Sequence, residues 1–342
     1  MRAVTSARPR MADVARRAGV GAITVSRALR TPERVSAEVR ERVRAAIEAT
    51  GYVPNLAAGT LKSRRSGIVA AIVPTLRSAI FAETVDALAE GLEAHGLQLL
   101  VASSGYSIDA EAQIVRRMLG RQPDAVVLTG TRHAVQVRAM LRARAIPVVE
   151  TWELADDPID RAVGFSNRDA AYRMTLALAA RGHRRIAFVG TPPEVERRAS
   201  QRLDGYRAAM RELGRAADVA MLDELGVTIG SGERGAEALL ARPDPPDAAF
   251  FVNDVAAFGA VQACQRRGIS VPGRLAIAGF GDFEIARASN PPLTTVRIPG
   301  AEIGRTAARW VVERLAGDGQ ARDDGGPRTT DLGFELVMRE SA

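Results

Sequence analysis

The 342-residue sequence is poor in several kinds of residue, and each shortage excludes a class of structure or chemistry. The single cysteine, Cys264, excludes an intramolecular disulfide and a cysteine-based zinc cage, and it is expected to be a small core residue. The three histidines lie at scattered positions, so neither a metal ion nor another cofactor is expected. No run approaches about 18 uninterrupted apolar residues, and no hydrophobic signal core opens the sequence. These absences predict a cytoplasmic protein.

The positive charge is concentrated in one part of the chain. Residues 1–66 contain 14 basic and 5 acidic residues, a balance of +9, whereas the remainder contains 33 basic and 35 acidic residues, a balance of −2. A basic segment on a near-neutral body suits contact with nucleic-acid phosphates. A transit peptide or a membrane-surface arm is disfavoured, because the basic segment also contains acidic residues and helical patterns.

The basic segment carries the pattern of a helix-turn-helix between Ala12 and Arg30. Gly19 stands at the break between two short helices, where glycine adopts left-handed backbone angles without steric cost. The apolar seam between the helices is predicted to consist of Val14, Val20, Val25 and Leu29. The face predicted to enter a DNA major groove consists of Ala22, Ile23, Ser26 and Arg27. An ordinary helical hairpin inside a core is the alternative that these residues alone leave open.

Two further segments complete this region. Ser36 is predicted to cap a third helix from Ser36 to Thr50, which Gly51 ends and along which apolar residues repeat at every fourth position. Pro54 to Lys62 forms a short, weakly helical segment that needs a partner or DNA in order to fold.

The runs DVARRAGVGAITVSRAL and RVSAEVRERVRAAIEATGYVPNLAAGTLK resemble the headpiece of the lactose-repressor family of bacterial transcription regulators. The resemblance implies that Ala22, Ile23 and Arg27 read bases, and that Thr24, Ser26 and Asn55 contact phosphates or the DNA backbone. It also implies that Ala58 and Leu61 enter the minor groove, where the two leucines of a dimer wedge a base step.

Two positions depart from the family pattern. Arg10 and Gly21 stand where the family usually has hydroxyl residues that cap the first two helices. Each missing cap lowers local helix stability by about 1 kcal/mol, so we expect a headpiece that frays easily off DNA.

From Gly67 the pattern changes to apolar strands that alternate with helices, in two series. Such a pattern predicts an α/β core of two doubly wound subdomains, each with a parallel sheet, and ligands that bind beyond the carboxyl ends of the strands. The family's periplasmic-binding-protein-like core has this layout. The predicted strands are 67–73, 97–102, 124–128 and 146–150 in the first series, and 185–190, 220–222, 248–252 and 275–280 in the second.

The domain organisation follows from these patterns and from the resemblance. We expect a disordered tail (1–9), a helix-turn-helix headpiece (10–53), a hinge helix with its linker (54–66) and an effector-binding and dimerisation core (67–342). Within the core, the resemblance assigns residues 67–163 and 294–326 to one subdomain and 164–293 and 327–342 to the other.

The resemblance also indicates the residues that bind a small effector. Arg202, in QRLDGY, matches the family's effector-binding arginine, whose planar fork suits a carboxylate or a sugar diol. A surface salt bridge or a helix-end charge is the alternative. Asn253 and Asp254 match a family motif whose side chains bind hydroxyls or cap the next helix, and capping alone is a sufficient explanation for Asp254. The remaining candidates are Asp282, one position beyond the family's usual aspartate, and two aromatic residues for an apolar wall, Phe81 and Trp152.

The segment IPVVETWELADDPIDRAVGFSN resembles the gluconate-operon repressors within the family. The expected function is therefore a homodimeric repressor that binds a palindromic operator and is released by a sugar acid, with gluconate as the hypothesis. A corepressor response is the alternative within the family, because the sequence does not determine which cleft angle the ligand prefers.

Two other classes of protein, an enzyme and a transport protein, share features with this sequence. Gly230 to Gly235 reads G-x-G-x-x-G, the dinucleotide-binding fingerprint, but the stretch before it is short and mid-chain, and no other motif suggests an enzyme. A transporter's solute-binding protein would share the core fold, but the basic helix-turn-helix disfavours it.

Overall fold

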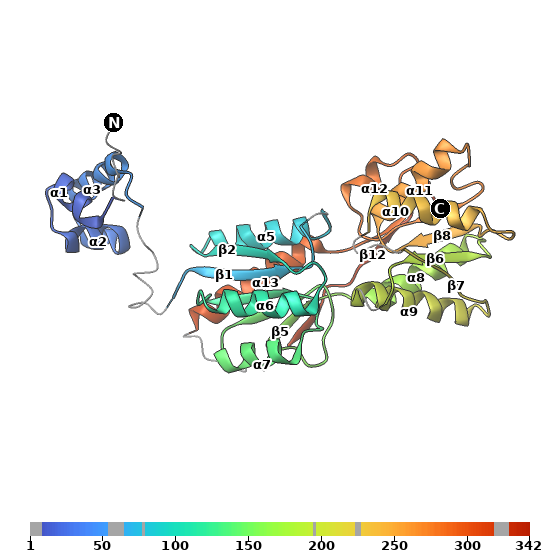
Figure 1. Cartoon of the computed structure of the whole chain (residues 1–342), viewed down its shortest axis with the longest axis horizontal. Coiled ribbons are helices and arrows are strands. Elements are labelled where there is room, and N and C mark those ends of the chain that lie inside the picture. The colour runs from blue at the N-terminus through green and yellow to red at the C-terminus, as the bar shows by residue number, and fades with distance from the viewer. Residues whose placement is uncertain (1–8, 54–64, 77–78, 194–195, 223–226, 318–327) are drawn as a thin grey trace, which may run out of the picture. The chain divides into compact units, whose positions relative to one another are not determined.

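The computed structural model describes residues 9–53, 65–76, 79–193, 196–222, 227–317 and 328–342 (Figure 1). The chain forms two compact units, Met1–Ser66 and Gly67–Ala342. Within the described ranges, no helix combines the length and the apolar character that a membrane span requires. Asn55, Ala58 and Leu61, and most of the predicted tail and hinge, lie outside the described residues.

The first unit contains the three predicted helices and a short 3-10 turn. Their bounds are α1 (Met11–Ala18), α2 (Ala22–Arg30), η1 (Pro32–Arg34) and α3 (Ala37–Thr50). The small core of this unit consists of Val14, Ala15, Ala18, Val25, Val43 and Ala46. The prediction for Leu29 is wrong, because its side chain is 38% exposed and Ala28, three residues after Val25, continues the seam instead.

The second unit begins with a six-stranded parallel sheet in the order β11-β5-β4-β3-β1-β2. Its strands are β1 (Ile68–Val73), β2 (Gln98–Ser103), β3 (Ala125–Thr129), β4 (Val148–Thr151), β5 (Arg161–Gly164) and β11 (Thr329–Asp331). Its helices are α5 (Ala82–Glu93), α6 (Ile108–Leu119), α7 (Val135–Arg144) and α13 (Gly300–Ala316), with η2 (Ala79–Phe81) before α5. Alternate residues of β1 face opposite layers: Val69 packs in the core that includes α5 and α13, and Ala70 in the core that includes α6 and α7.

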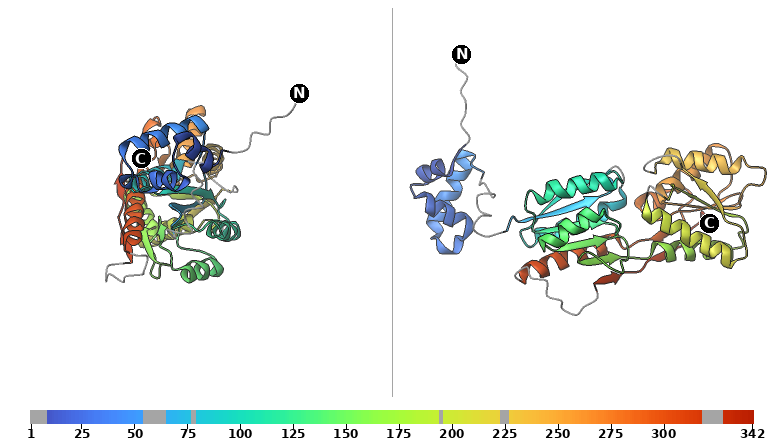
Figure 2. Two further views of the ribbon diagram at one scale, coloured as in Figure 1. Left: turned by 90° about the vertical axis from the view of Figure 1, so that its left-hand side faces the viewer. Right: turned by 60° about the horizontal axis from the view of Figure 1, so that its bottom comes forward.

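A second parallel sheet has the order β7-β6-β8-β9. Its strands are β6 (Ile186–Gly190), β7 (Asp218–Met221), β8 (Ala248–Phe251) and β9 (Ala276–Ala278). Its helices are α8 (Asn167–Ala180), α9 (Arg197–Glu212), α10 (Ile229–Leu240) and α11 (Asp254–Arg266), followed by the short α12 (Glu284–Ala288). The two sheets and their helices form the two lobes of the core, and the C-terminus lies in the second lobe (Figure 2).

The two lobes share chain segments that cross between them. β10 (Thr295–Arg297) pairs antiparallel with β12 (Glu335–Val337), and Figure 1 shows β12 between the lobes. β11 pairs with β5 in the first sheet, so the last crossing follows Asp331. The predicted boundary at residues 326 and 327 is therefore wrong by several residues, because the polar three-residue strand TTD has no apolar pattern that announces it.

The G-x-G-x-x-G sequence lies inside α10, where it serves helix packing. A Cβ on Gly232 would stand 2.0 Å from the carbonyl oxygen of Ala256, so α10 and α11 approach each other too closely for any side chain there. This contact explains the glycine without a dinucleotide.

Candidate DNA-binding and effector-binding sites

The turn of the helix-turn-helix is held by a long-range contact. Gly19 ends α1 with φ of 63°, in the left-handed region. Arg42 of α3 then donates hydrogen bonds to the carbonyl oxygens of Ala18 (3.0 and 2.5 Å) and Gly19 (3.1 Å). A cation at the carboxyl end of a helix satisfies its free carbonyls and complements its dipole. Arg42 therefore fixes the angle at which α2 leaves the turn. This role of Arg42 could not be predicted from its position in the sequence of α3.

The predicted base-reading face of α2 is open to solvent. Ile23 is 75% exposed, and Ala22 and Arg27 are also exposed, whereas Thr24 and Ser26 are half-buried. The side chain of Ile23 is therefore accessible to a DNA surface that approaches this face. Ala22 and Ile23 lack hydrogen-bonding side chains, so their available contacts with bases are apolar, such as those to thymine methyl groups.

The helix starts of the headpiece show what replaces one of the two missing hydroxyl caps. Neither Arg10 nor Gly21 supplies a side-chain cap. The carboxylate of Asp13 accepts a hydrogen bond from the backbone N–H of Arg10 at 2.9 Å, which ties down the start of α1 from within the helix. Ser36 caps α3 as predicted, accepting a hydrogen bond from the backbone N–H of Val39.

In the second unit, a cavity of about 240 Å³ is lined by residues from both lobes. The first lobe contributes the segments that follow β1, β2, β3 and β4, and the second lobe contributes the start of α9. The site therefore lies at the carboxyl ends of parallel strands, as predicted. Its lining includes Ser104, Tyr106, Glu111, Gly130, Arg132, Glu153, Glu196, Arg197 and Arg198.

Arg202 lies in a smaller cavity of about 20 Å³, which shares Glu196 and Arg198 with the larger one. Its guanidinium donates a hydrogen bond to Asn167 (2.8 Å), lies 3.7 Å from Glu196 and stacks over the ring of Phe280 at 4.6 Å. Among the residues that the structure describes, none is a hydrogen-bond partner of its buried Nε. Burial lowers the pKa of Arg202 to about 10, and the carboxylate of Glu196 opposes that shift. Arg202 is thus a charged, buried side chain with one donor still free, as a site for a polar ligand requires.

The two aromatic candidates pack against each other at the edge of this region. Trp152 lines the smaller cavity with φ of 73°, and its indole N–H donates to Thr84 at 3.2 Å. Phe81 meets Trp152 edge-on at 4.7 Å, and its ring lies 5.4 Å beneath the guanidinium of Arg198. Phe81 therefore supports a residue of the cavity wall and is not itself among the residues that line either cavity.

The polar candidates separate in the structure. Asn253 lines the smaller cavity while its side chain caps α11, accepting the N–H of Ala256 at 3.0 Å. Asp282 is placed elsewhere: its carboxylate pairs with Arg339 (2.6 Å) and Arg297 (2.8 Å), and it is absent from the lining of both cavities. Its sequence position beside the family's usual aspartate did not distinguish a ligand contact from this ion cluster.

A buried carboxylate that sequence reasoning missed connects the lobes. Glu153, which follows Trp152, accepts a hydrogen bond from Thr131 at 2.8 Å in its own lobe. From the second lobe, Arg197 donates to Glu153 at 3.2 Å, and Arg198 lies 3.8 Å away. The position of Glu153 could have indicated its role, because polar residues directly after buried parallel strands gather at one sheet edge.

The charges of the larger cavity nearly balance. Its lining contains Arg132, Arg197 and Arg198 opposite Asp109, Glu111, Glu153 and Glu196. Carboxylates accept hydrogen bonds from hydroxyl groups, and arginines donate to hydroxyl or carboxylate oxygens. The lining therefore suits a ligand that has hydroxyl groups and a carboxylate. Within the described part of the chain, no group of histidine, cysteine and acidic residues has the spacing of a metal site.

Comparison with known proteins bears on both units. The sequence profile of bacterial regulatory proteins of the lacI family matches residues 10–55, and that of the periplasmic binding protein-like domain matches residues 175–342. The HTH-type transcriptional regulator GntR of Pseudomonas aeruginosa is 36% identical over 340 residues, which cover 98% of this chain and 96% of that protein.

Solved structures extend the comparison. A LacI-family transcriptional regulator from Silicibacter pomeroyi superposes with a TM-score of 0.89 at 32% identity, covering 97% of this chain and 99% of its own. The transcription regulator GntR from Chromobacterium violaceum superposes with a TM-score of 0.73 at 38% identity, covering 80% of this chain and 98% of its own.

Proposed function

Since this chain belongs to the lacI family of bacterial regulatory proteins, we propose that it represses transcription from an operator and releases that DNA when gluconate binds the core. Its partner is chromosomal DNA, so its place of action is the cytoplasm. The observation that carries the effector assignment is the cavity between the lobes, where arginines and carboxylates meet in nearly equal number.

A linear polyhydroxy acid fits this chemistry. The carboxylate of such a ligand takes bidentate hydrogen bonds from a guanidinium, and its hydroxyls donate to Glu153 and Glu196. The smaller cavity, which shares Glu196 and Arg198 with the larger one, adds a buried donor, the Nε of Arg202. The relatives named GntR, and the resemblance of residues 146–167 to gluconate-operon repressors, support gluconate among the acids of this class.

The DNA-binding assembly is a homodimer in this proposal. One α2 reads only half a site, and a two-fold symmetric protein matches a palindromic operator. By the family resemblance, Leu61 wedges the central step of that operator, and Asn55 and Ala58 belong to the same hinge.

Effector binding changes the angle between the lobes and so the spacing of the two hinge segments. A ligand shifts such an equilibrium only by its difference in affinity for the two angles. Glu153 and the arginines at the start of α9 face each other across the lobes, so a ligand that enters the cavity alters contacts that set this angle.

The test is fluorescence anisotropy of the full chain on labelled DNA from its own upstream region, with gluconate, related aldonates and neutral hexoses added in turn. Tight binding that gluconate releases is the expected result. Binding that responds only to a neutral hexose, or that gluconate tightens, refutes the assignment of gluconate as inducer.

A matched DNA of scrambled sequence controls for phosphate attraction, which falls steeply with salt. Equal affinity for the two DNAs at moderate salt would contradict the operator assignment. It would favour a solute-binding protein of the same core fold.

A further inference from the structure

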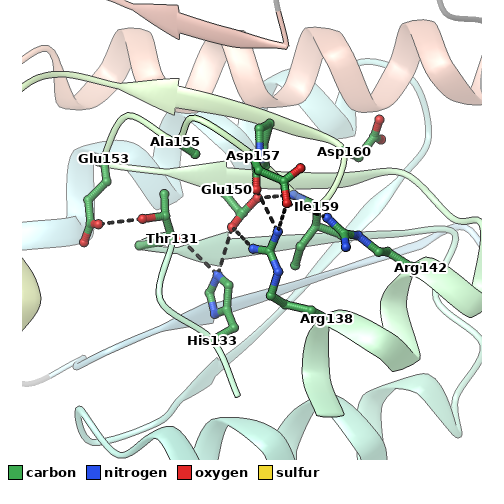
Figure 3. Close-up of polar contacts among 12 residues, drawn as sticks. Thr131, His133, Arg138, Arg142, Glu150, Glu153, Ala155, Asp157, Ile159 and Asp160 are labelled. Carbon is green, nitrogen blue, oxygen red and sulfur yellow. Dashed lines mark hydrogen bonds and ion pairs between the residues drawn. The ribbon is translucent and has the colours of Figure 1, made fainter. Parts of the chain in front are cut away.

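A buried histidine lies directly behind the wall of the larger cavity, in the segment that follows β3. The Nδ1 of His133 is 2.7 Å from a carboxylate oxygen of Glu111, on α6. Its Nε2 is 3.1 Å from the carbonyl oxygen of Gly130 and 3.4 Å from a carboxylate oxygen of Glu150, on β4 (Figure 3). Each ring nitrogen therefore faces oxygen atoms that only accept hydrogen bonds. A neutral imidazole has a proton on one nitrogen alone, so this geometry favours the charged form.

The surrounding charges agree with that preference. Burial disfavours a charged imidazole, but the hydrogen bond to Glu111 and the carboxylate of Glu150 outweigh it and raise the pKa of His133 to about 9. From α7, Arg138 lies 3.6 Å from Glu150 and pairs with Asp157, as Figure 3 shows. The fully buried carboxylate of Glu150 also accepts the backbone N–H of Ile159 at 2.5 Å. The cluster is thus a row of alternating charges. His133 lies between Glu111 and Glu150, and Arg138 lies between Glu150 and the exposed Asp157.

The same segment reaches the contact between the lobes. Glu111 and Gly130 both line the cavity, and Thr131 donates its hydroxyl to Glu153. Gly130 lies so close that a Cβ there would be 3.3 Å from both the Glu153 carboxylate and the Arg198 guanidinium. Residues 130–133 therefore connect the ion pair between Glu153 and Arg198 with the buried imidazole. The contacts of His133 with Glu111 and Glu150 hold this segment in place.

We propose that His133 is a positioning residue of the effector site. Its imidazolium holds the segment 130–133 against Glu111 and Glu150, so that Thr131 presents Glu153 to the arginines of the second lobe. Loss of the proton removes one of the two anchors and loosens the cavity wall. Effector affinity consequently falls as pH rises through the titration of His133.

The effector arm of the test uses gluconate and so rests on the proposed function. Calorimetry compares the full chain at pH 7.5 and 9.5 with His133→Gln and, as the matched control, His183→Gln. His183 lies in the second lobe, 3.9 Å from Asp247 and outside the cavity lining. We expect the wild type to lose up to about fourfold in affinity over this range, whereas His133→Gln binds weakly at both pH values and His183→Gln follows the wild type.

Glu150→Gln tests the midpoint of the pH profile, which would not change if the role of His133 were merely structural. It removes one of the carboxylates that stabilise the imidazolium but keeps an acceptor for Ile159. The midpoint of the pH profile should therefore shift to lower pH. An unshifted midpoint, or a wild-type affinity that stays flat while His133→Gln binds normally, overturns the proposal.

Two measurements on the unliganded protein separate this inference from the choice of gluconate. In proton NMR, the imidazole signal that is absent from His133→Gln should keep its protonated shift beyond pH 8, and titration below pH 7 overturns the inference. Hydrogen exchange at pH 7.5 should be faster over residues 129–134 in His133→Gln than in the wild type or His183→Gln. If the wild type fails to bind gluconate, the effector assignment fails, and unchanged exchange in this segment then refutes the positioning role as well.

Discussion

Replacing Arg202 with alanine separates ligand recognition from folding. The variant loses the hydrogen bond to Asn167 and the stacking on Phe280, each worth about 1–2 kcal/mol in a buried setting. Part of this loss is offset, because the buried guanidinium with its unpartnered Nε no longer has to be desolvated. Glu196 keeps Arg198 at 3.1 Å, so its charge is not left unpaired. The net cost in the free energy of unfolding is about 1–3 kcal/mol, which lowers Tm by about 2–8 °C.

The ligand loses the one donor that Arg202 has left unpartnered. A single charge-assisted hydrogen bond from its Nε contributes about 1.5–3 kcal/mol, so gluconate affinity should fall by about 10–10². Operator affinity without ligand should stay within about threefold of the wild type, since α2 and its exposed face are unchanged.

The assay is operator anisotropy titrated with gluconate, beside a thermal melt of the same preparation. Arg207→Ala, an exposed arginine of the same helix, is the matched control and should behave as the wild type. Release of Arg202→Ala from DNA at ordinary gluconate concentrations would refute the reasoning. Equal loss of operator binding and gluconate response would instead show that the variant is misfolded.

Three other predictions concern packing, titration and DNA. Gly232→Ala should lower the free energy of unfolding by about 1–3 kcal/mol in a denaturant melt, because its Cβ would strike the backbone of α11. Gly230→Ala is the control and should not lower it, because the nearest neighbour of its Cβ would be 3.6 Å away. Equal stability of the two variants would contradict the packing role of Gly232. Burial raises the pKa of Asp254 to about 7, so between about pH 4 and 7 the folded state holds a proton that the unfolded state releases, and stability falls as pH rises. Asp254→Asn should remove that slope from chemical melts at pH 4.5 and 8, and an unchanged slope would assign it to other groups. Leu61→Ala should lose specific operator binding but keep the salt-sensitive binding to scrambled DNA, and retained specificity in anisotropy would argue against the wedge.

Long, apolar elements of this fold were predictable and short, polar ones were not. The run GIVAAIV is a strand buried on both faces, and its continuous apolar character indicates that directly. β5 and β11 are three or four residues long and contain arginine, threonine and aspartate, so their place in the sheet comes from pairing with distant neighbours. Pairing of this kind leaves no local pattern.

The site shows the same division. Arg202 was found because it matches a family pattern, and Trp152 because it is an aromatic residue near a strand end; the structure brings both to one cavity. Glu153 and Arg198 lie in different lobes and meet only through the crossing strands, so no spacing along the chain relates them. Asp282 shows the converse, because a residue one position from a family motif points instead to a cluster of arginines.

The interleaved order of the two lobes has a consequence for synthesis of the chain. The first lobe needs α13, whose Gly304 lies so close to α5 that a Cβ would be 2.3 Å from the carbonyl oxygen of Thr84, and it needs β11 at its edge. Figure 2 shows α13 in this lobe, although ribosomes make it only after residues 165–293. A nascent chain therefore carries an uncovered apolar face on α5 and an unpaired edge on β5 while residues 165–293 of the second lobe emerge. The lobe that is begun first is thus completed only after most of the other has been made, and during that interval the growing polypeptide offers chaperones a binding surface.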